Sequence, residues 1–271
     1  MLKTELRNEK SKHFDKMDTV DMLKLMNEEN MNAVKAVGNA MGEISKVVDA
    51  VSERMEKDGR LFYVGAGTSG RLGVVDASEC PPTFGVDYGK VVGVIAGGRD
   101  AMFRANEGGE DKAENGRADL AAFELNENDS VLGVSAAGGA AYVVGALEYA
   151  KECGCFTAAL TCNDDTKISK AADVTIVTDT GAEVVTGSTR LKAGTAQKLV
   201  LNMISTCCMV KNGYVYENLM INLKPTNIKL RDRMVRIVCD ILGIEYDKSN
   251  ELLEKADWNI RGAVALYKEE K

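Results

Sequence analysis

The chain has 271 residues, of which 45% are hydrophobic and 28% charged, and it carries a net charge of −7. That length and composition suit one large α/β domain, or one such domain with a small appendage. The acidic balance excludes binding of nucleic acid through bulk electrostatics, and no run of about 18 apolar residues predicts a membrane span.

The seven cysteines and the single histidine limit the kinds of metal site and catalytic site that the chain can form. An odd number of cysteines, in a chain that starts without an apolar signal-peptide core, is typical of reduced thiols, so we expect a cytoplasmic protein. Because His13 is the one histidine, a zinc site and a Ser-His-Asp triad are both disfavoured. Any general acid or base must therefore come from a carboxylate, Lys, Tyr or Cys.

The N-terminal part is predicted to be irregular to residue 18 and helical after it. Apolar residues recur at spacings of three and four from Val34 to Met55, which predicts one stripe of a single helix. Gly59 is expected to be its C-cap.

Five short apolar runs follow, at residues 61–64, 91–95, 130–134, 156–160 and 174–177. Continuous runs of this length, bounded by turn residues, are typical of parallel strands buried on both faces. Helices are predicted between and after them, at residues 71–78, 101–120, 142–153, 167–172 and 192–212. The alternation predicts an α/β fold with a doubly wound five-stranded parallel sheet flanked by helices, whose ligands bind beyond the carboxyl ends of the strands.

The character of the chain changes beyond Pro225. Three helical patterns follow, at residues 228–242, 248–256 and 259–268. We expect a small separate three-helix unit, and we place the boundary between a first domain of residues 1–230 and a helical domain of residues 231–271.

The loop after the first strand is the first candidate for a ligand. Glycines let the backbone approach an anion, and a helix N-terminus adds unpaired N–H groups. Gly67, Thr68, Ser69 and Gly70 are therefore predicted to bind phosphate. A tight turn without a ligand remains the alternative from the residues alone.

Two acidic segments follow. Pro81 and Pro82 are predicted to end a helix and to hold Glu79 near the first loop. Residues 106–111 interrupt a helical pattern with glycines and carboxylates, Glu110 among them. Each glutamate suits a general acid or base, and each equally suits a solvated surface position.

The segment after the fifth strand places Ser188, Thr189 and Lys192 at the start of a long helix, which suits an anion. Ser188 or Thr189 could instead cap that helix.

Two long runs resemble the N-acetylmuramic acid 6-phosphate etherases, namely LFYVGAGTSGRLGVVDASECPPTFG and GAEVVTGSTRLKAGTAQKLVLNMIST. The resemblance extends from about residue 6 to the end and includes NLKPTNIKLRDR. It implies a sugar-isomerase (SIS) fold, a homodimer with the site near the subunit interface, and a C-terminal helical domain similar to ubiquitin-associated domains. The tail ends earlier than is usual in the family, so we expect its last helices to be reduced.

The resemblance also implies a reaction. The family cleaves the D-lactyl ether of N-acetylmuramic acid 6-phosphate by elimination and water addition, in cell-wall amino-sugar recycling. The products are N-acetylglucosamine 6-phosphate and D-lactate, and neither a metal nor an organic cofactor takes part. The family's proton donor lies in ASECPP, which places it on Glu79, and its second glutamate closes an EGxED segment, which places it on Glu110. We assign Glu79 as acid and Glu110 as base, and the resemblance leaves the reverse order open.

One loop departs from the family pattern. Where the family reads AASGRTPYV, residues 135–143 read SAAGGAAYV, so Ala137 stands for Ser and Gly139 for Arg. Losing one charge-assisted hydrogen bond costs about 1.5–3 kcal/mol, or one to two decades in affinity. We therefore expect weakened substrate binding, with Ser135 restoring one hydroxyl as a predicted phosphate ligand.

Two other functions remain open for this sequence. A non-catalytic sugar-phosphate sensor, like the glucokinase regulatory protein, is the main alternative, although a pure sensor does not need Glu79 and Glu110. A sugar-phosphate isomerase is a third, disfavoured by DASECPP.

Overall fold

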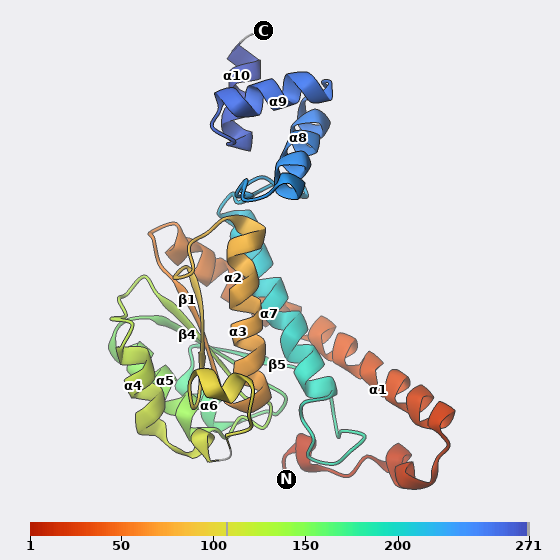
Figure 1. The fold of residues 1–271 in the computed structure, drawn as a ribbon. Coiled ribbons are helices and arrows are strands. Elements are labelled where there is room, and N and C mark those ends of the chain that lie inside the picture. Colours follow the sequence, from red (N-terminus) through yellow and green to blue (C-terminus); the bar gives the residue numbers. More distant parts are fainter. Residues whose placement is uncertain (107, 270–271) are drawn as a thin grey trace. The chain divides into compact units, whose positions relative to one another are not determined.

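The computed structural model describes residues 1–106 and 108–269. The chain forms two compact units, one of residues 1–78 and 89–208 and the other of residues 79–88 and 209–271 (Figure 1). The domain boundary at residue 230 stays a prediction.

The first unit is built on a five-stranded sheet. Its strands are β1 (Leu61–Gly65), β2 (Val91–Ile95), β3 (Ser130–Val134), β4 (Phe156–Thr161) and β5 (Val174–Val177). All neighbours pair in parallel, in the order β2-β1-β3-β4-β5, which confirms the predicted sheet. The order reverses between β1 and β3, so the loops after these two strands part there and leave room for a ligand.

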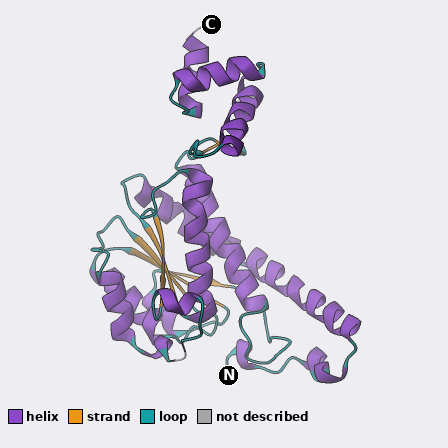
Figure 2. Cartoon of the chain, in the orientation of Figure 1, coloured by secondary structure: helices purple, strands orange, loops and turns teal. Residues whose placement is uncertain are grey.

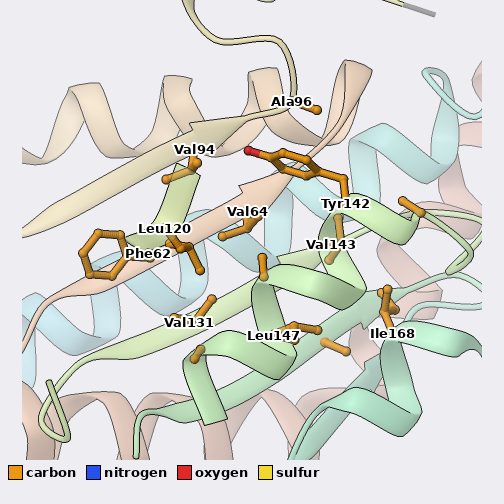
Figure 3. Close-up of a cluster of buried hydrophobic side chains, with 14 of the residues drawn as sticks. Phe62, Val64, Val94, Ala96, Leu120, Val131, Tyr142, Val143, Leu147 and Ile168 are labelled. Carbon is orange, nitrogen blue, oxygen red and sulfur yellow. The ribbon is translucent and has the colours of Figure 1, made fainter. Parts of the chain in front are cut away.

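Helices cover both faces of this sheet (Figure 2). The helices that begin in the first unit are α1 (Thr19–Asn39), α2 (Met41–Met55), α3 (Gly67–Phe84), α4 (Ala113–Ala121), α5 (Ala141–Glu152), α6 (Lys167–Ala171) and α7 (Lys192–Lys211). Alternate residues of β1 face opposite layers. Phe62 packs with Leu120 and Leu147 of α4 and α5 in one buried cluster (Figure 3), whereas Tyr63 donates to the carbonyl of Leu201 on α7 at 3.3 Å.

The predicted single helix over residues 34–55 is wrong. The chain forms α1 and α2 with Ala40 between them, and Val34 lies 55% exposed while Val37 is buried. Gly38 and Asn39 precede the break, and both residue types have poor helix propensity. The C-cap of α2 is Glu56, so the prediction of Gly59 as the C-cap is wrong as well.

Two further helix predictions are corrected. Helix α3 continues through Pro81 and Pro82 to Phe84. The fixed proline φ is compatible with a helix, and the two rings remove only the hydrogen bonds to the carbonyls of Ala77 and Ser78. Residues 101–120 are not one helix. They include two 3₁₀ turns, η4 (Arg99–Met102) and η5 (Gly109–Asp111), and most of α4. Gly108 lies between them at φ +83°, which a continuous helix cannot accommodate.

Residues 1–18 hold three short 3₁₀ turns, η1 (Lys3–Glu5), η2 (Glu9–Ser11) and η3 (Phe14–Lys16), in a segment predicted to be irregular. Among the described residues no helix is long and apolar enough to cross a membrane.

The second unit ends in three helices, α8 (Ile228–Leu242), α9 (Tyr246–Lys255) and α10 (Ile260–Glu269), as predicted. Asn227 caps α8 by accepting from Leu230 N, and Gly243 ends it at φ +64°. Buried Val238, Leu252 and Ile260 join the three helices in one core. A short hairpin, β6 (Val215–Tyr216) with β7 (Leu219–Met220), was not predicted. The likeness to ubiquitin-associated domains stays a prediction.

Candidate functional site

A cavity of about 300 Å³ lies at the carboxyl ends of β1 and β3. It is lined by Glu5, Ala66, Gly67, Thr68, Ser69, Glu110, Val134, Ser135, Ala136, Ala137, Ala140, Gly187 and Thr189. Four separate segments flagged by the sequence thus meet in one place, together with a fifth from the N-terminus. The volume falls at the lower end of the range for small-molecule sites and suits a monosaccharide phosphate.

The loop after β1 forms one wall of the cavity. Helix α3 begins at Gly67, whose φ of +53° favours glycine, and the first N–H groups of a helix have no partner inside it. Ser69 is buried, and its hydroxyl donates to Oε1 of Gln197 on α7 at 3.0 Å. Gly70 does not line the cavity, since it packs behind the loop, where an added Cβ would lie 2.6 Å from the carbonyl oxygen of Gly65. This wall offers backbone N–H groups and the hydroxyl of Thr68 to an anion.

The loop after β3 forms the facing wall. Ser135 is buried, and its Oγ accepts from Gly138 N at 3.1 Å, which fixes the turn. Gly138 has φ +77°, and a Cβ there would collide with the side chain of Thr166. Ala137 and Ala140 line the cavity, so this wall presents methyl groups to a ligand.

The start of α7 is already occupied by a carboxylate of the chain itself. Glu183 accepts from Lys192 N at 3.2 Å and from Ala193 N at 2.9 Å. Burial raises the pKa of this carboxyl. Capping by Ser188 or Thr189, the alternative left open by the sequence, is therefore replaced by Glu183. Thr189 still lines the cavity, whereas Ser188 does not.

Lys192 lies behind the cavity in a buried ion pair. Its Nζ contacts Glu29 Oε2 at 2.5 Å, and the two side chains are 3% and 5% exposed. Glu29 also accepts from Asn8 at 2.9 Å and from Lys10 at 3.0 Å. Burial by itself raises the pKa of Glu29, but the hydrogen bonds and charges of Lys192 and Lys10 outweigh it and bring the pKa to about 2. The ammonium of Lys192 thus ties α7 to α1, and its role in phosphate binding stays a prediction.

The two predicted catalytic glutamates differ in position. Glu110 lies in η5 and lines the cavity. Glu79 lies exposed on α3 and is absent from the described lining. Glu107, in the same acidic segment as Glu110, lies outside the described residues.

Glu5 lines the cavity and was missed by sequence reasoning. It belongs to a short polar segment without periodicity or glycine signals, so nothing local marked it. The described lining holds two carboxylates and four hydroxyl side chains and includes no Lys, Arg or His. A phosphate in this cavity would therefore be held by neutral donors.

Comparison with known proteins decides the family. The chain is 49% identical to the N-acetylmuramic acid 6-phosphate etherase of Clostridium beijerinckii, over 98% of this chain and 87% of the relative. It is 50% identical to that of Bacillus mycoides, over 98% of this chain and 90% of the relative. The chain belongs to the N-acetylmuramic acid 6-phosphate etherase family. The etherase of Cronobacter sakazakii is 48% identical, over 98% of this chain and 89% of its own length.

Family models and solved structures agree with this etherase fold. The model of the glucokinase regulatory protein N-terminal SIS domain matches residues 43–151, and the SIS domain model matches residues 115–206. A phosphoheptose isomerase from Francisella tularensis superposes with a TM-score of 0.55 at 18% identity, covering 71% of this chain and 98% of its own. One from Neisseria gonorrhoeae gives 0.51 at 16% identity, covering 71% and 97%. At such identities these two structures support the fold alone.

Proposed function

We propose that this protein cleaves the D-lactyl ether of N-acetylmuramic acid 6-phosphate, giving N-acetylglucosamine 6-phosphate and D-lactate in cell-wall amino-sugar recycling. The observation that carries the proposal is the near full-length similarity to etherases, in a chain whose cavity joins the α3 cradle to Glu110. We also propose that it acts in the cytoplasm, on the odd number of cysteines.

The phosphate is proposed to lie against the start of α3. Thr68 and Ser135 offer hydroxyls there, Ser69 offers its backbone N–H, and Thr189 offers a further hydroxyl from the segment before α7. The positive end of the helix dipole and its unpaired N–H groups favour a dianion at this position. The sugar then extends toward Glu110.

The reaction needs two proton transfers. The C2 proton, acidified by the neighbouring open-chain aldehyde, is removed by an ionised carboxylate, and the ether oxygen on C3 is protonated as lactate leaves. Water then adds at C3, and C2 regains a proton. We assign the base to Glu110 and the acid to Glu79, whose environments must differ so that one is ionised and the other protonated. We propose that no metal or organic cofactor takes part.

Glu79 is proposed to act from a second subunit. Ten residues of helix α3 separate it from Ser69, which is roughly 15 Å along the helix axis at the ordinary rise. A homodimer with the site near its interface would bring the partner subunit's Glu79 to the cavity. Exposed Val20, Leu23, Met31 and Val34 share one face of α1 and offer an apolar surface for such an interface.

Mixing two inactive variants tests this arrangement. Glu79→Gln and Glu110→Gln homodimers are each expected to be inactive. After dissociation and reassociation, a mixed dimer regains one intact site if each site uses one glutamate from either chain. Recovery of up to about a quarter of wild-type D-lactate release supports the shared site. No recovery, with mixed dimers demonstrated by differential tags, would place both glutamates in one chain.

A sugar-phosphate sensor is the second candidate. The match to the glucokinase regulatory protein domain and the apolar loop at Ala137 and Ala140 both favour it. Incubation with N-acetylmuramic acid 6-phosphate separates the two functions. The etherase releases D-lactate, whereas a sensor binds N-acetylglucosamine 6-phosphate in calorimetry and releases none.

A further inference from the structure

Glu5 is a carboxylate of the cavity that the proposed reaction leaves without a role. It comes from the first residues of the chain, far in sequence from every other lining segment. Its Oε2 lies 3.5 Å from the position that a Cβ of Gly187 would occupy, and Gly187 lines the cavity as well. The carboxylate of Glu5 therefore lies beside the loop that precedes α7.

Lys3 fixes the segment on one side of Glu5. Its Nζ contacts Asp164 at 2.8 Å and Asp179 at 2.7 Å, in the loops after β4 and β5. Its backbone N–H donates to Asn163 Oδ1 at 2.7 Å. Three contacts by one residue hold the N-terminal segment at the carboxyl edge of the sheet.

Thr4 fixes the segment from within. It is fully buried, and its Oγ1 accepts from Asn163 Nδ2 at 3.1 Å. The same Nδ2 donates to the carbonyl of Ala136 at 3.1 Å, and Ala136 lines the cavity. The residue before Glu5 is thus coupled to the wall of the site, so the position of Glu5 is set by the same groups that shape the cavity.

The chemistry of the lining defines what Glu5 can bind. The cradle at α3 and the hydroxyls of Thr68 and Ser135 provide donors for an anion. An ionised carboxylate accepts hydrogen bonds and donates none, and it repels a phosphate or a second carboxylate. It therefore suits the uncharged part of an amino sugar, whose hydroxyl O–H and acetamido N–H groups need acceptors.

We propose that Glu5 is a substrate-binding residue that accepts hydrogen bonds from the hydroxyl or acetamido groups of the bound amino-sugar phosphate. Lys3 is the positioning residue that holds it there. The proposal rests on the proposed function for its substrate, and it adds a third acidic residue to the site beside Glu79 and Glu110.

Kinetics of Glu5 variants test the proposal. Glu5→Ala is expected to raise KM for N-acetylmuramic acid 6-phosphate about 10–100-fold with kcat within about threefold, because a contact made equally in ground and transition state affects KM alone. Glu5→Gln keeps one acceptor oxygen and is expected to fall between Ala and wild type. Glu9→Gln, an exposed acid on the same segment and outside the cavity, is the matched control and is expected to behave as wild type.

Variants of Lys3 provide an independent test of the proposal. Lys3→Met is expected to raise KM in the same direction as Glu5→Ala, and Lys3→Arg to restore it, since Arg can still bridge two carboxylates. Binding of N-acetylglucosamine 6-phosphate, measured by calorimetry, is expected to weaken in parallel for Glu5→Ala and Lys3→Met.

Wild-type KM and wild-type product affinity in folded Glu5→Ala would overturn the proposal. A fall in kcat with unchanged KM would also overturn it, because it would make Glu5 part of the chemical step. If wild-type protein releases no D-lactate, the proposed function fails. The calorimetric comparison then still decides whether Glu5 contacts an amino-sugar phosphate.

Discussion

Ala137 and Gly139 are the two residues of the loop after β3 that leave room for larger side chains. Ala137 lines the cavity with a methyl group, and an added Cβ at Gly139 meets no atom within 4 Å. The loop thus has space for the larger polar side chains that the family pattern carries. Its backbone is held by Ser135 and Gly138 whatever stands at these positions.

Restoring polar groups in this loop is expected to tighten binding. Ala137→Ser adds one neutral hydrogen bond and should lower the Kd for N-acetylglucosamine 6-phosphate about 2–10-fold. Gly139→Arg adds a charge-assisted bond and should lower it about 10–100-fold. Calorimetry on both variants checks this, with Gly139→Gln as the uncharged control. Unchanged affinities would mean that the phosphate does not contact this loop.

Glu29 and Lys192 form a buried ion pair that is expected to stabilise the folded chain. Glu29→Gln leaves the Lys192 ammonium buried without its partner charge, which typically costs about 3–5 kcal/mol. A fall in melting temperature of roughly 6–20 °C at pH 7 is expected. Glu43→Gln, which breaks an exposed pair with Lys46, is the control and is expected to change little.

The same pair predicts a pH dependence. The pKa of Glu29 falls from an ordinary 4.5 to about 2 in the folded chain. Its stabilisation is therefore fully present above about pH 4.5 and is lost as the pH falls toward 2. The difference in melting temperature between wild type and Glu29→Gln should shrink over that range. A difference that is constant from pH 7 to pH 3 would contradict a charged pair.

Helix α7 illustrates the element scale, because its N-terminus is closed by Glu183 rather than opened to a ligand. Glu183→Ala removes the acceptor of two backbone N–H groups. Loss of a helix cap typically costs about 0.5–2 kcal/mol, so a melting temperature lower by roughly 1–8 °C is expected. Differential scanning calorimetry measures it, with exposed Glu148→Ala on α5 as control. Equal melting temperatures would show that these N–H groups find other partners.

Elements with a local cause were predictable from the sequence. The five strands are continuous apolar runs, and α8 lies between Asn227 and Gly243, two residues with clear capping roles. The glycines after β1 indicated the cradle for the same reason. Helix α3 was cut short in the prediction, because two prolines signal an end that the helix does not make.

Features that depend on contacts between residues far apart in the sequence could not be predicted. Lys192 indicated an anion site at the start of α7, but its partner Glu29 lies 163 residues away in the sequence. The segment that carries Glu5 is held by Asp164 and Asp179, 161 and 176 residues from Lys3. No periodicity or spacing near either residue encodes such contacts.

At the scale of the whole molecule, the exposed apolar face of α1 is the surface that we propose for contact with a second copy of the chain. Leu23→Asp with Val34→Asp places two charges on that face and is expected to give a monomer in light scattering coupled to gel filtration. Glu148→Lys, at an exposed position of α5 and away from α1, is the control and should keep the wild-type assembly. A monomeric wild type would contradict the proposed homodimer.

The same variant connects assembly with activity. If the partner subunit's Glu79 completes each site, the monomer should lose D-lactate release while its own cavity, with Thr68 and Ser135, still binds N-acetylglucosamine 6-phosphate. An active monomer would show that one chain holds a full site.

Glu110 is proposed to remove the C2 proton when this chain cleaves the ether. The reaction run in deuterium oxide with wild type and with Glu110→Gln tests it, following D-lactate and deuterium at C2 of the sugar by NMR. Wild type should release D-lactate and incorporate deuterium at C2, and Glu110→Gln should do neither. Release of D-lactate without deuterium at C2 would contradict removal of the C2 proton. A Glu110→Gln variant as fast as wild type would contradict Glu110 as the base.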